Sequence, residues 1–222
     1  MKKIKNYIVP LSLMLLIPLI NLIYSSLNSS ARGVHSLVTD IDKSVPFIKS
    51  FAIPYILWAP FILITLIYLC FRNREVYYRV IICLIIGLMI CFLTYYFFQT
   101  AVPRPQLQGN DIFTNLVRYI YNIDNPFNCF PSIHVFTSYI LIKGTMSCGK
   151  KVSIDSIIIT LIASMIILST QFIKQHVVMD LIFAILLGNV LYKAVWYFST
   201  KISCLKVSKV NFALPITKKI ES

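Results

Sequence analysis

Apolar stretches separated by short polar segments are the main pattern along this chain, and they predict membrane-spanning helices. Roughly 20 apolar helical residues cross the hydrocarbon core of a bilayer, and most of the stretches reach or approach that length. They cover residues 8–24, 51–71, 80–98, 131–148, 152–170 and 177–198. We therefore expect an all-α integral membrane protein in which six transmembrane helices form one bundle, with residues 1–222 as a single membrane domain.

The first and fourth stretches need further argument. Residues 131–148 contain Lys143, but this lysine lies near one end and can extend to the headgroups. The first stretch follows a lysine-rich N-terminus, as in a secretory signal, and residues 29–31 would serve as a cleavage site. It is long for the apolar region of a signal, which favours an uncleaved first helix. Either alternative leaves the later spans in the same orientation.

Composition excludes a soluble protein. The chain is 58% hydrophobic and 13% charged, and a soluble domain of 222 residues could not bury so much apolar surface. The 6 cysteines fall mostly in or beside apolar stretches, which argues against a secreted disulfide framework. Because no two cysteines have CxxC spacing, we expect no zinc site, and we expect no other metal or cofactor.

The uneven distribution of the 21 lysines and arginines sets the expected orientation. With the N-terminus inside, most of them lie in inner segments, as the positive-inside rule requires. The net charge of +13 then reflects topology and attraction to anionic lipids, and no folded basic domain favours nucleic-acid binding. We expect a multi-pass plasma-membrane protein with cytoplasmic termini, a core at residues 80–200 and a basic tail at residues 201–222.

The longest connection, residues 99–130, would then lie outside between the third and fourth spans. Its apolar residues recur at helical spacing, and either Asn110 or Asp111 could cap the helix that they predict. These residues are Ile112, Phe113, Leu116, Val117, Ile120 and Tyr121. A short amphipathic helix at the membrane interface is expected, either as a plain cover over the bundle or as a lid that shapes lipid access.

Three short clusters carry the candidate chemistry, and the expected topology places all of them at the outer face. They are Arg104-Pro105, Pro131-Ser132-Ile133-His134 and the segment from His176 to Asp180. On a helix, His176 and Asp180 would share one face, and the carboxylate would orient the imidazole for attack or for proton transfer. Two other interpretations stay open for this pair: a structural tie between helices, and a proton relay in a small transporter.

The second cluster suits a bound phosphate. Proline is favoured in the first turn of a helix, whose free amides attract anions, and Ser132 would add a hydroxyl donor. His134 would face the same phosphate as a general acid. Arg104 offers a fork of donors for phosphate oxygens, and Lys174 offers a second cation, although each taken alone also fits a surface charge near the headgroups. The remaining histidine, His35, matches no motif and is expected to be exposed.

The order of these clusters resembles the type 2 phosphatidic acid phosphatase superfamily. The likeness covers residues 104–188 and includes Ser169, seven residues before His176. It implies a six-helix membrane enzyme that uses no metal and forms a phosphohistidine at His176. Asp180 would orient that histidine, and His134 would protonate the leaving alkoxide. Arg104, Ser132 and Lys174 would hold the phosphate, and the substrate would be a membrane lipid.

Two departures from the phosphatase pattern favour one branch of that superfamily. Phe97 stands where the pattern has a lysine, and Thr170 stands where it has an arginine. Val102-Pro103-Arg104-Pro105 and the segment from Ser169-Thr170 to Lys174-Gln175-His176 look closer to the inositol phosphorylceramide synthase-like branch, whose members move phospho-headgroups between lipids. The loss of two cations fits a phosphodiester substrate, and weakened activity is the alternative. The sequence therefore predicts a lipid phosphatase or phosphotransferase. A catalytically inactive lipid-binding relative and a small proton-coupled transporter are the alternatives.

Overall fold

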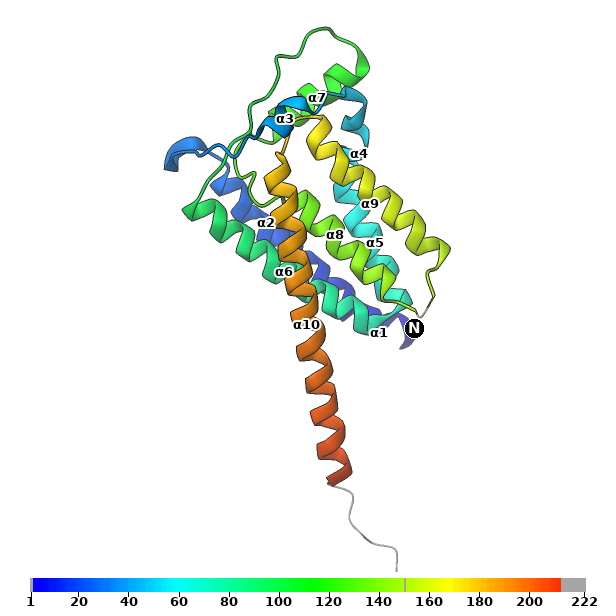
Figure 1. Ribbon diagram of the computed structural model, residues 1–222. Coiled ribbons are helices and arrows are strands. Elements are labelled where there is room, and N and C mark those ends of the chain that lie inside the picture. Colours follow the sequence, from blue (N-terminus) through cyan, green and yellow to red (C-terminus); the bar gives the residue numbers. More distant parts are fainter. Residues whose placement is uncertain (1, 150, 213–222) are drawn as a thin grey trace, which may run out of the picture.

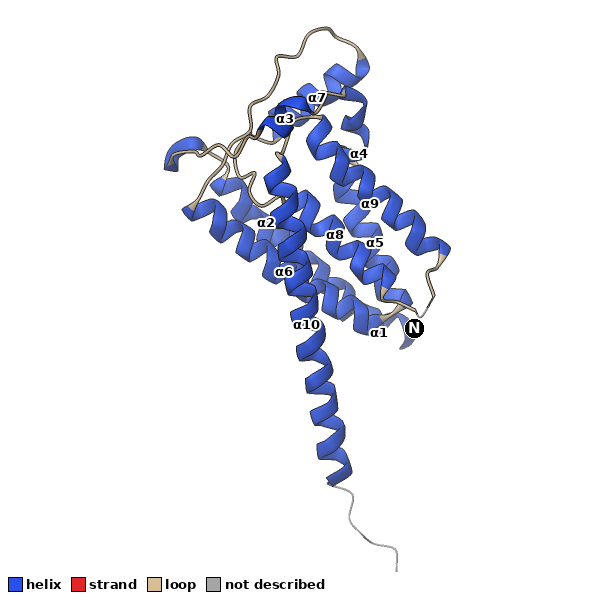
Figure 2. Cartoon of the chain, viewed as in Figure 1, coloured by secondary structure: helices blue, strands red, loops and turns tan. Residues whose placement is uncertain are grey.

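The computed structural model describes residues 2–149 and 151–212, which form helices joined by loops (Figures 1 and 2). Part of the expected basic tail, residues 213–222, lies outside the described residues. The α-helices are α1 (Lys2–Ser12), α2 (Leu16–Leu27), α3 (Asp40–Ser44), α4 (Ala52–Ile56), α5 (Trp58–Arg72), α6 (Arg74–Phe97), α7 (Ile112–Ile123), α8 (Ile133–Met146), α9 (Ile154–Phe172) and α10 (Val178–Phe212). Short 3₁₀ turns occupy Leu13–Leu15, Ser30–Arg32 and Lys49–Phe51.

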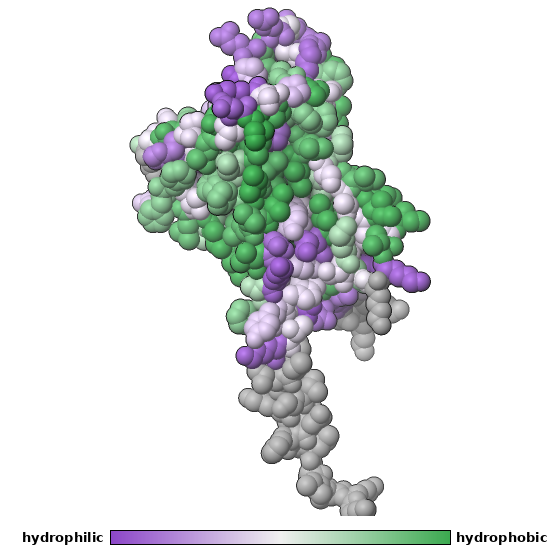
Figure 3. Space-filling model, viewed as in Figure 1, coloured by the Kyte–Doolittle hydropathy of each residue, from purple (hydrophilic) through white to green (hydrophobic). Residues whose placement is uncertain are grey.

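Within residues 2–149 and 151–212, the structure contains 5 helical segments long and apolar enough to cross a membrane. They are Tyr7–Leu27, Lys49–Arg72, Arg74–Phe97, Ile154–Phe172 and Val178–Ile202. The all-helical, multi-pass membrane architecture expected from the sequence is therefore confirmed. Figure 3 shows why it needs lipid: on the visible face, a broad hydrophobic band crosses the bundle, and hydrophilic side chains gather toward its ends.

The predicted fourth span, α8, falls short of a spanning helix by itself. It has 14 residues, which correspond to about 21 Å at 1.5 Å per residue. It lies inside the bundle in contact with α5, α6, α9 and α10, and most of its side chains are buried. Because neighbouring helices rather than lipid surround it, α8 can carry polar side chains such as His134 without exposing them to hydrocarbon.

Close packing of α8 against α6 depends on a glycine in α6. A Cβ atom built on Gly87 would lie 1.9 Å from the ring of Phe136. Glycine therefore allows the Phe136 ring to lie directly on the α6 backbone, as small residues do where membrane helices meet. This contact fixes the height of α8, and hence of His134 two residues earlier, relative to α6.

The helix predicted in the long connection is present as α7. Asp111 caps it, because the carboxylate accepts hydrogen bonds from the amides of Phe113 and Thr114 at 3.1 and 3.2 Å. A hydrogen bond from Lys49 at 2.5 Å, together with the Thr114 bonds, lowers the pKa of Asp111. Val117 and Ile120 are buried, and α7 packs on α4 at the end of the bundle where α8 and α10 begin. Its position at a membrane interface stays a prediction.

The N-terminal helices are part of the bundle rather than a loose extension. The Tyr77 hydroxyl donates to the Pro10 carbonyl at 2.5 Å, and the Gln99 amide donates to the Leu27 carbonyl at 2.8 Å. The Tyr24 hydroxyl donates to Asp124 at 2.6 Å. These bonds join the N-terminal helices to α6, to Gln99 and to Asp124, and an uncleaved first helix stays a prediction.

Candidate functional site

The two histidine-containing clusters meet at the end of the bundle covered by α3 and α7 (Figure 1). His134 lies in the first turn of α8, and Asp180 lies in the first turn of α10. The Ser132 amide donates to the Asp180 carbonyl at 3.3 Å, which ties the starts of the two helices together. Ser132, His134, His176 and Asp180 are all buried.

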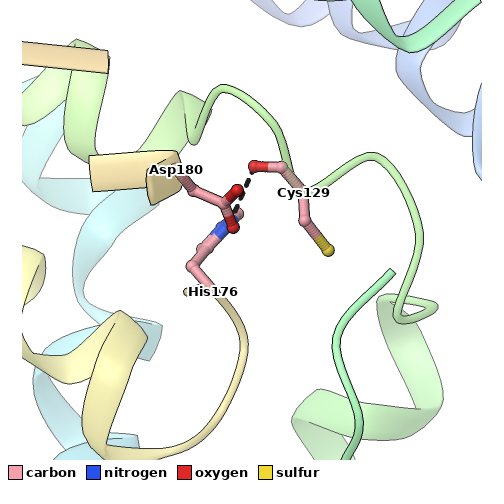
Figure 4. A group of neighbouring side chains, drawn as sticks. All are labelled: Cys129, His176 and Asp180. Carbon is pink, nitrogen blue, oxygen red and sulfur yellow. Dashed lines mark hydrogen bonds and ion pairs between the residues drawn. The ribbon is translucent and has the colours of Figure 1, made fainter. Parts of the chain in front are cut away.

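The pairing of His176 with Asp180 is observed, but not on one helix. His176 lies in the turn before α10, which begins at Val178. Asp180 folds back toward it, so that its Oδ2 lies 3.2 Å from His176 Nδ1 and accepts the Val177 amide at 3.0 Å. The Cys129 carbonyl oxygen lies 3.1 Å from the same Nδ1 (Figure 4). With two acceptors at Nδ1, the proton belongs there and the lone pair of His176 is on Nε2.

That free nitrogen faces the second histidine. His176 Nε2 lies 3.4 Å from His134 Nδ1, which is long for a hydrogen bond but usual for catalytic pairs without substrate. The imidazole of His134 packs against the rings of Tyr55 and Trp58, at centroid distances of 4.6 and 4.1 Å. The Trp58 indole donates to Thr137 at 2.8 Å. Asp180, His176 and His134 therefore form a continuous buried chain of titratable groups.

Ser132 is the N-cap of α8, which begins at Ile133, so Pro131 precedes the helix and does not lie in its first turn as expected. Its hydroxyl oxygen accepts the Val135 amide at 3.3 Å, while the hydroxyl proton remains available to another acceptor. The phosphate-binding role expected of Ser132 stays a prediction.

Arg104 has a structural role that the sequence did not indicate. Its terminal nitrogens donate to the carbonyls of Tyr121 and Asp124 at 3.0 and 2.6 Å, and to the side chain of Gln175 at 2.6 Å. The guanidinium also stacks on the Tyr121 ring at 4.3 Å. Burial lowers the pKa of Arg104, although the Asp124 carboxylate opposes this shift, and arginine keeps its charge. Arg104 thus holds the end of α7 against the site.

Lys174 connects the site to α3. Its ammonium donates to the carbonyls of Asp42 and Val45 at 2.9 and 2.5 Å. The Asp42 carboxylate in turn accepts the amide of Val178 at 2.7 Å. Burial opposes ionisation of Asp42, but hydrogen bonds from Thr39 and Val178 and the charge of Lys174 together lower its pKa. Lys174 is a fixed cation beside His176, held by the loop that precedes the second span.

Arg104, Lys174 and His176 line one cavity of about 430 Å³, which we name the Arg104 cavity. The sequence did not point to two glutamines at this cavity: Gln171 lines it, and Gln175 bonds Arg104. Among the described residues, neither buried side-chain amide nitrogen has a hydrogen-bond partner, and neither has Arg104 Nε. Buried N–H donors without acceptors are costly, so this group of donors favours an anionic ligand.

A second cavity, of about 420 Å³, is lined by His134 and not by His176. We name it the Trp58 cavity, and its lining includes His134, Trp58, Tyr24, Tyr55 and Asp124. The Asp124 carboxylate accepts hydrogen bonds from Tyr24 and from Tyr55, at 2.6 and 3.2 Å. His176 therefore opens on a cavity rich in positive charge and N–H donors, and His134 opens on a cavity that contains a carboxylate.

The two departures from the phosphatase pattern occupy different environments. Phe97, at the end of α6, has 79% of its surface exposed and does not line either cavity. Thr170 is buried, and its carbonyl accepts the amides of Gln175 and His176 at 2.9 and 3.1 Å. The next residue, Gln171, lines the Arg104 cavity and has a side-chain N–H donor.

Cys129, His176 and Asp180 have ligand atoms within 4.8 Å of one another and form a candidate metal group (Figure 4). The donors do not suit a metal well. His176 Nδ1 already faces two hydrogen-bond acceptors, and burial raises the pKa of the Cys129 thiol, which favours its protonated, weakly binding form.

No family model, curated protein or solved structure matches this chain.

Proposed function

We propose that this protein is a membrane lipid phosphatase or phosphotransferase of the type 2 phosphatidic acid phosphatase superfamily, closest to the inositol phosphorylceramide synthase-like branch. One observation carries the proposal. An imidazole oriented by Asp180 presents its free nitrogen beside a cavity lined by Arg104 and Lys174. A nucleophile, a general acid within reach and fixed positive charge are what phosphoryl transfer through a phosphohistidine needs.

The proposed reaction has two steps. His176 Nε2 attacks phosphorus as the bond from phosphorus to the lipid oxygen breaks, and His134 gives that oxygen a proton. His134 then takes a proton from water or from an acceptor alcohol, whose oxygen attacks phosphorus as the bond to His176 breaks. Because the two imidazole nitrogens are only 3.4 Å apart, a phosphoryl group must separate them on binding. Arg104, Lys174, Ser132 and the start of α8 would hold its oxygens.

The test of this function is a survey of substrates. Purified protein is incubated with lipid phosphates and lipid phosphodiesters, with and without added alcohols, and products are read by mass spectrometry. We expect release of a lipid alcohol from at least one substrate, and transfer to an alcohol if the protein is a transferase. Binding without any product would instead support an inactive relative, and proton-coupled solute uptake would support a transporter.

We propose that α8 completes a sixth crossing and that the site faces outward in the plasma membrane. A cysteine placed at the exposed Gln108, after the native cysteines are removed, should react with an impermeant thiol reagent in intact cells. A cysteine at the exposed Lys151, expected inside, should react only after lysis. The reverse labelling pattern would contradict the orientation derived from the charges.

Activity should not depend on a divalent metal. Among the residues that the structure describes, Asp180 is the only carboxylate that bonds either histidine, and its partner is His176. A site with one carboxylate is poor for magnesium. We expect turnover to survive dialysis against a chelator and to be inhibited by vanadate, which mimics phosphate. A strict requirement for an added divalent ion would rule out the proposed chemistry.

Replacing His134 by alanine should separate substrates by their leaving groups. A lipid alkoxide needs a proton to depart, so turnover on a lipid phosphate should fall by about 10²–10⁴-fold. An aryl phosphate with an acidic phenol needs no such proton, and its first step should be much less affected. The measurement is the rate of the burst of phenol release by His134→Ala and wild-type protein. Equal losses on both substrates would argue against a general-acid role.

A further inference from the structure

The Trp58 cavity continues into an apolar groove between α2 and α5. The groove has a volume of about 260 Å³ and shares Asn21, Trp58 and Ala59 with that cavity. From Trp58 it follows α5 to Leu66, a length of about 12 Å at 1.5 Å per residue. Leu63 in its wall has 52% of its surface exposed, so the groove opens toward the surroundings of the bundle.

The two ends of this passage differ in chemistry. The groove is lined almost entirely by apolar side chains, among them Met14, Ile62 and Leu66. At its other end the Trp58 cavity presents His134 and the Asp124 carboxylate. The carboxylate repels a phosphate, whereas the Arg104 cavity attracts one. An amphipathic molecule with an uncharged polar head and a hydrocarbon chain fits the passage.

We propose that the Trp58 cavity and the groove bind the lipid alcohol portion of the substrate, with its hydrocarbon chain between α2 and α5. This assignment rests on the proposed function and adds the location of the lipid alcohol and of its chain in this protein. The phosphate lies in the Arg104 cavity, and the bond that breaks joins phosphorus to the lipid oxygen beside His134. The proton from His134 makes that oxygen a hydroxyl, and the lipid alcohol departs along the groove into the membrane.

The groove selects and orients the lipid rather than driving its binding. Hydrocarbon in the bilayer and hydrocarbon in the groove have similar surroundings, so little free energy is gained by the transfer of the chain alone. Hydrogen bonds at the polar end, near His134 and Asp124, would hold the head. Diacylglycerol should therefore bind here in preference to phosphatidylcholine with the same chains, because the choline cation attached to the phosphate would have to enter the Arg104 cavity, where Arg104 and Lys174 repel it.

The chain offers an optical test, because it contains only 2 tryptophans, Trp58 and Trp196. Trp58 lines both the cavity and the groove, whereas Trp196 lies on α10 against Tyr192. Full-length Trp196→Phe protein, which retains Trp58, and Trp58→Phe protein, which retains Trp196, are placed in phosphatidylcholine nanodiscs. Fluorescence is followed as diacylglycerol with brominated chains is added, with brominated phosphatidylcholine of equal bromine content as the comparison.

We expect saturable quenching of Trp58 by brominated diacylglycerol, several-fold stronger than by brominated phosphatidylcholine. Trp196 should be quenched equally by both lipids. Equal quenching of Trp58 by the two lipids would overturn the assignment. Quenching does not require turnover. Saturable binding by a protein that releases no product would support the groove as a lipid-binding site and refute the proposed function.

A substitution at the junction gives an independent measurement. Ala59→Trp places a large side chain where the cavity and groove join, and Ala59 is exposed, so the larger residue need not disturb the core. The ratio of turnover on a long-chain lipid phosphate to turnover on a soluble aryl phosphate should fall about tenfold or more. Leu161→Trp, on an exposed position of α9, is the control and should leave that ratio unchanged. An unchanged ratio in Ala59→Trp would place the lipid chain elsewhere.

Discussion

Substitution of His176 by alanine is expected to reduce turnover by about a million-fold, to the background rate. Catalytic residues that act together are not additive, so loss of the nucleophile alone removes nearly the whole rate enhancement that these residues provide. His176 is buried, and its Nε2 is the free nitrogen of the chain formed with Asp180 and His134. The measurement is release of lipid alcohol from the best substrate by purified variant and wild-type protein, with folding checked by thermal unfolding in detergent.

The chain provides a matched control for this substitution. His35 is exposed, as expected, and stacks on Phe98 at 4.7 Å, while its backbone rather than its side chain bonds Gln99. His35→Ala should therefore leave turnover within about twofold, as surface substitutions usually do. Substantial activity in a well-folded His176→Ala protein would show that another group attacks phosphorus.

Asp180→Asn is expected to lower turnover on the order of 10³-fold with little change in substrate binding. The structure indicates which property is lost. The asparagine oxygen can still accept from Val177 and from His176 Nδ1, and the Cys129 carbonyl continues to hold the proton on Nδ1. The tautomer and geometry are therefore kept, and the loss reflects the negative charge that stabilises the imidazole as it becomes cationic during attack.

A structural role for Asp180 makes a different prediction. Asp180 accepts the Val177 amide at the start of α10, and an aspartate in this position also favours the helix terminus. If that were its whole function, Asp180→Asn would change thermal stability slightly and turnover would be near normal. Near-normal turnover in a folded Asp180→Asn protein would therefore remove the pair from the catalytic assignment.

Much of the fold could be predicted from the sequence because lipid imposes a simple rule on length and polarity. The apolar stretches became helices, and Asp111 caps α7 as its side chain allows. The rule fails for α8. A helix surrounded by other helices does not contact lipid, so it can be shorter and more polar than a lipid-facing helix. The same burial explains why a segment with His134 and Lys143 fits inside a membrane bundle.

The sequence predicts contacts within the candidate site between residues that are close in the chain. It does not predict contacts between residues from distant segments. The pairing of His176 with Asp180 follows from their spacing, although a turn rather than a helix brings them together. The contact of His176 with His134 and the bonds of Arg104 to the end of α7 join distant segments. Gln171 carried no distinguishing signal, because its importance lies in an unpartnered amide that only the folded chain reveals.

The central claim, that His176 forms a covalent bond to phosphorus, can be tested by trapping the intermediate. Wild-type protein is mixed with its best substrate, quenched within milliseconds at alkaline pH, where phosphohistidine survives, and digested for mass spectrometry. We expect a phosphoryl group on the peptide that contains His176, absent in His176→Ala and formed in Asp180→Asn at a greatly reduced rate. Turnover of the substrate without any phosphorylated peptide, or with the phosphoryl group on another residue, would contradict the account.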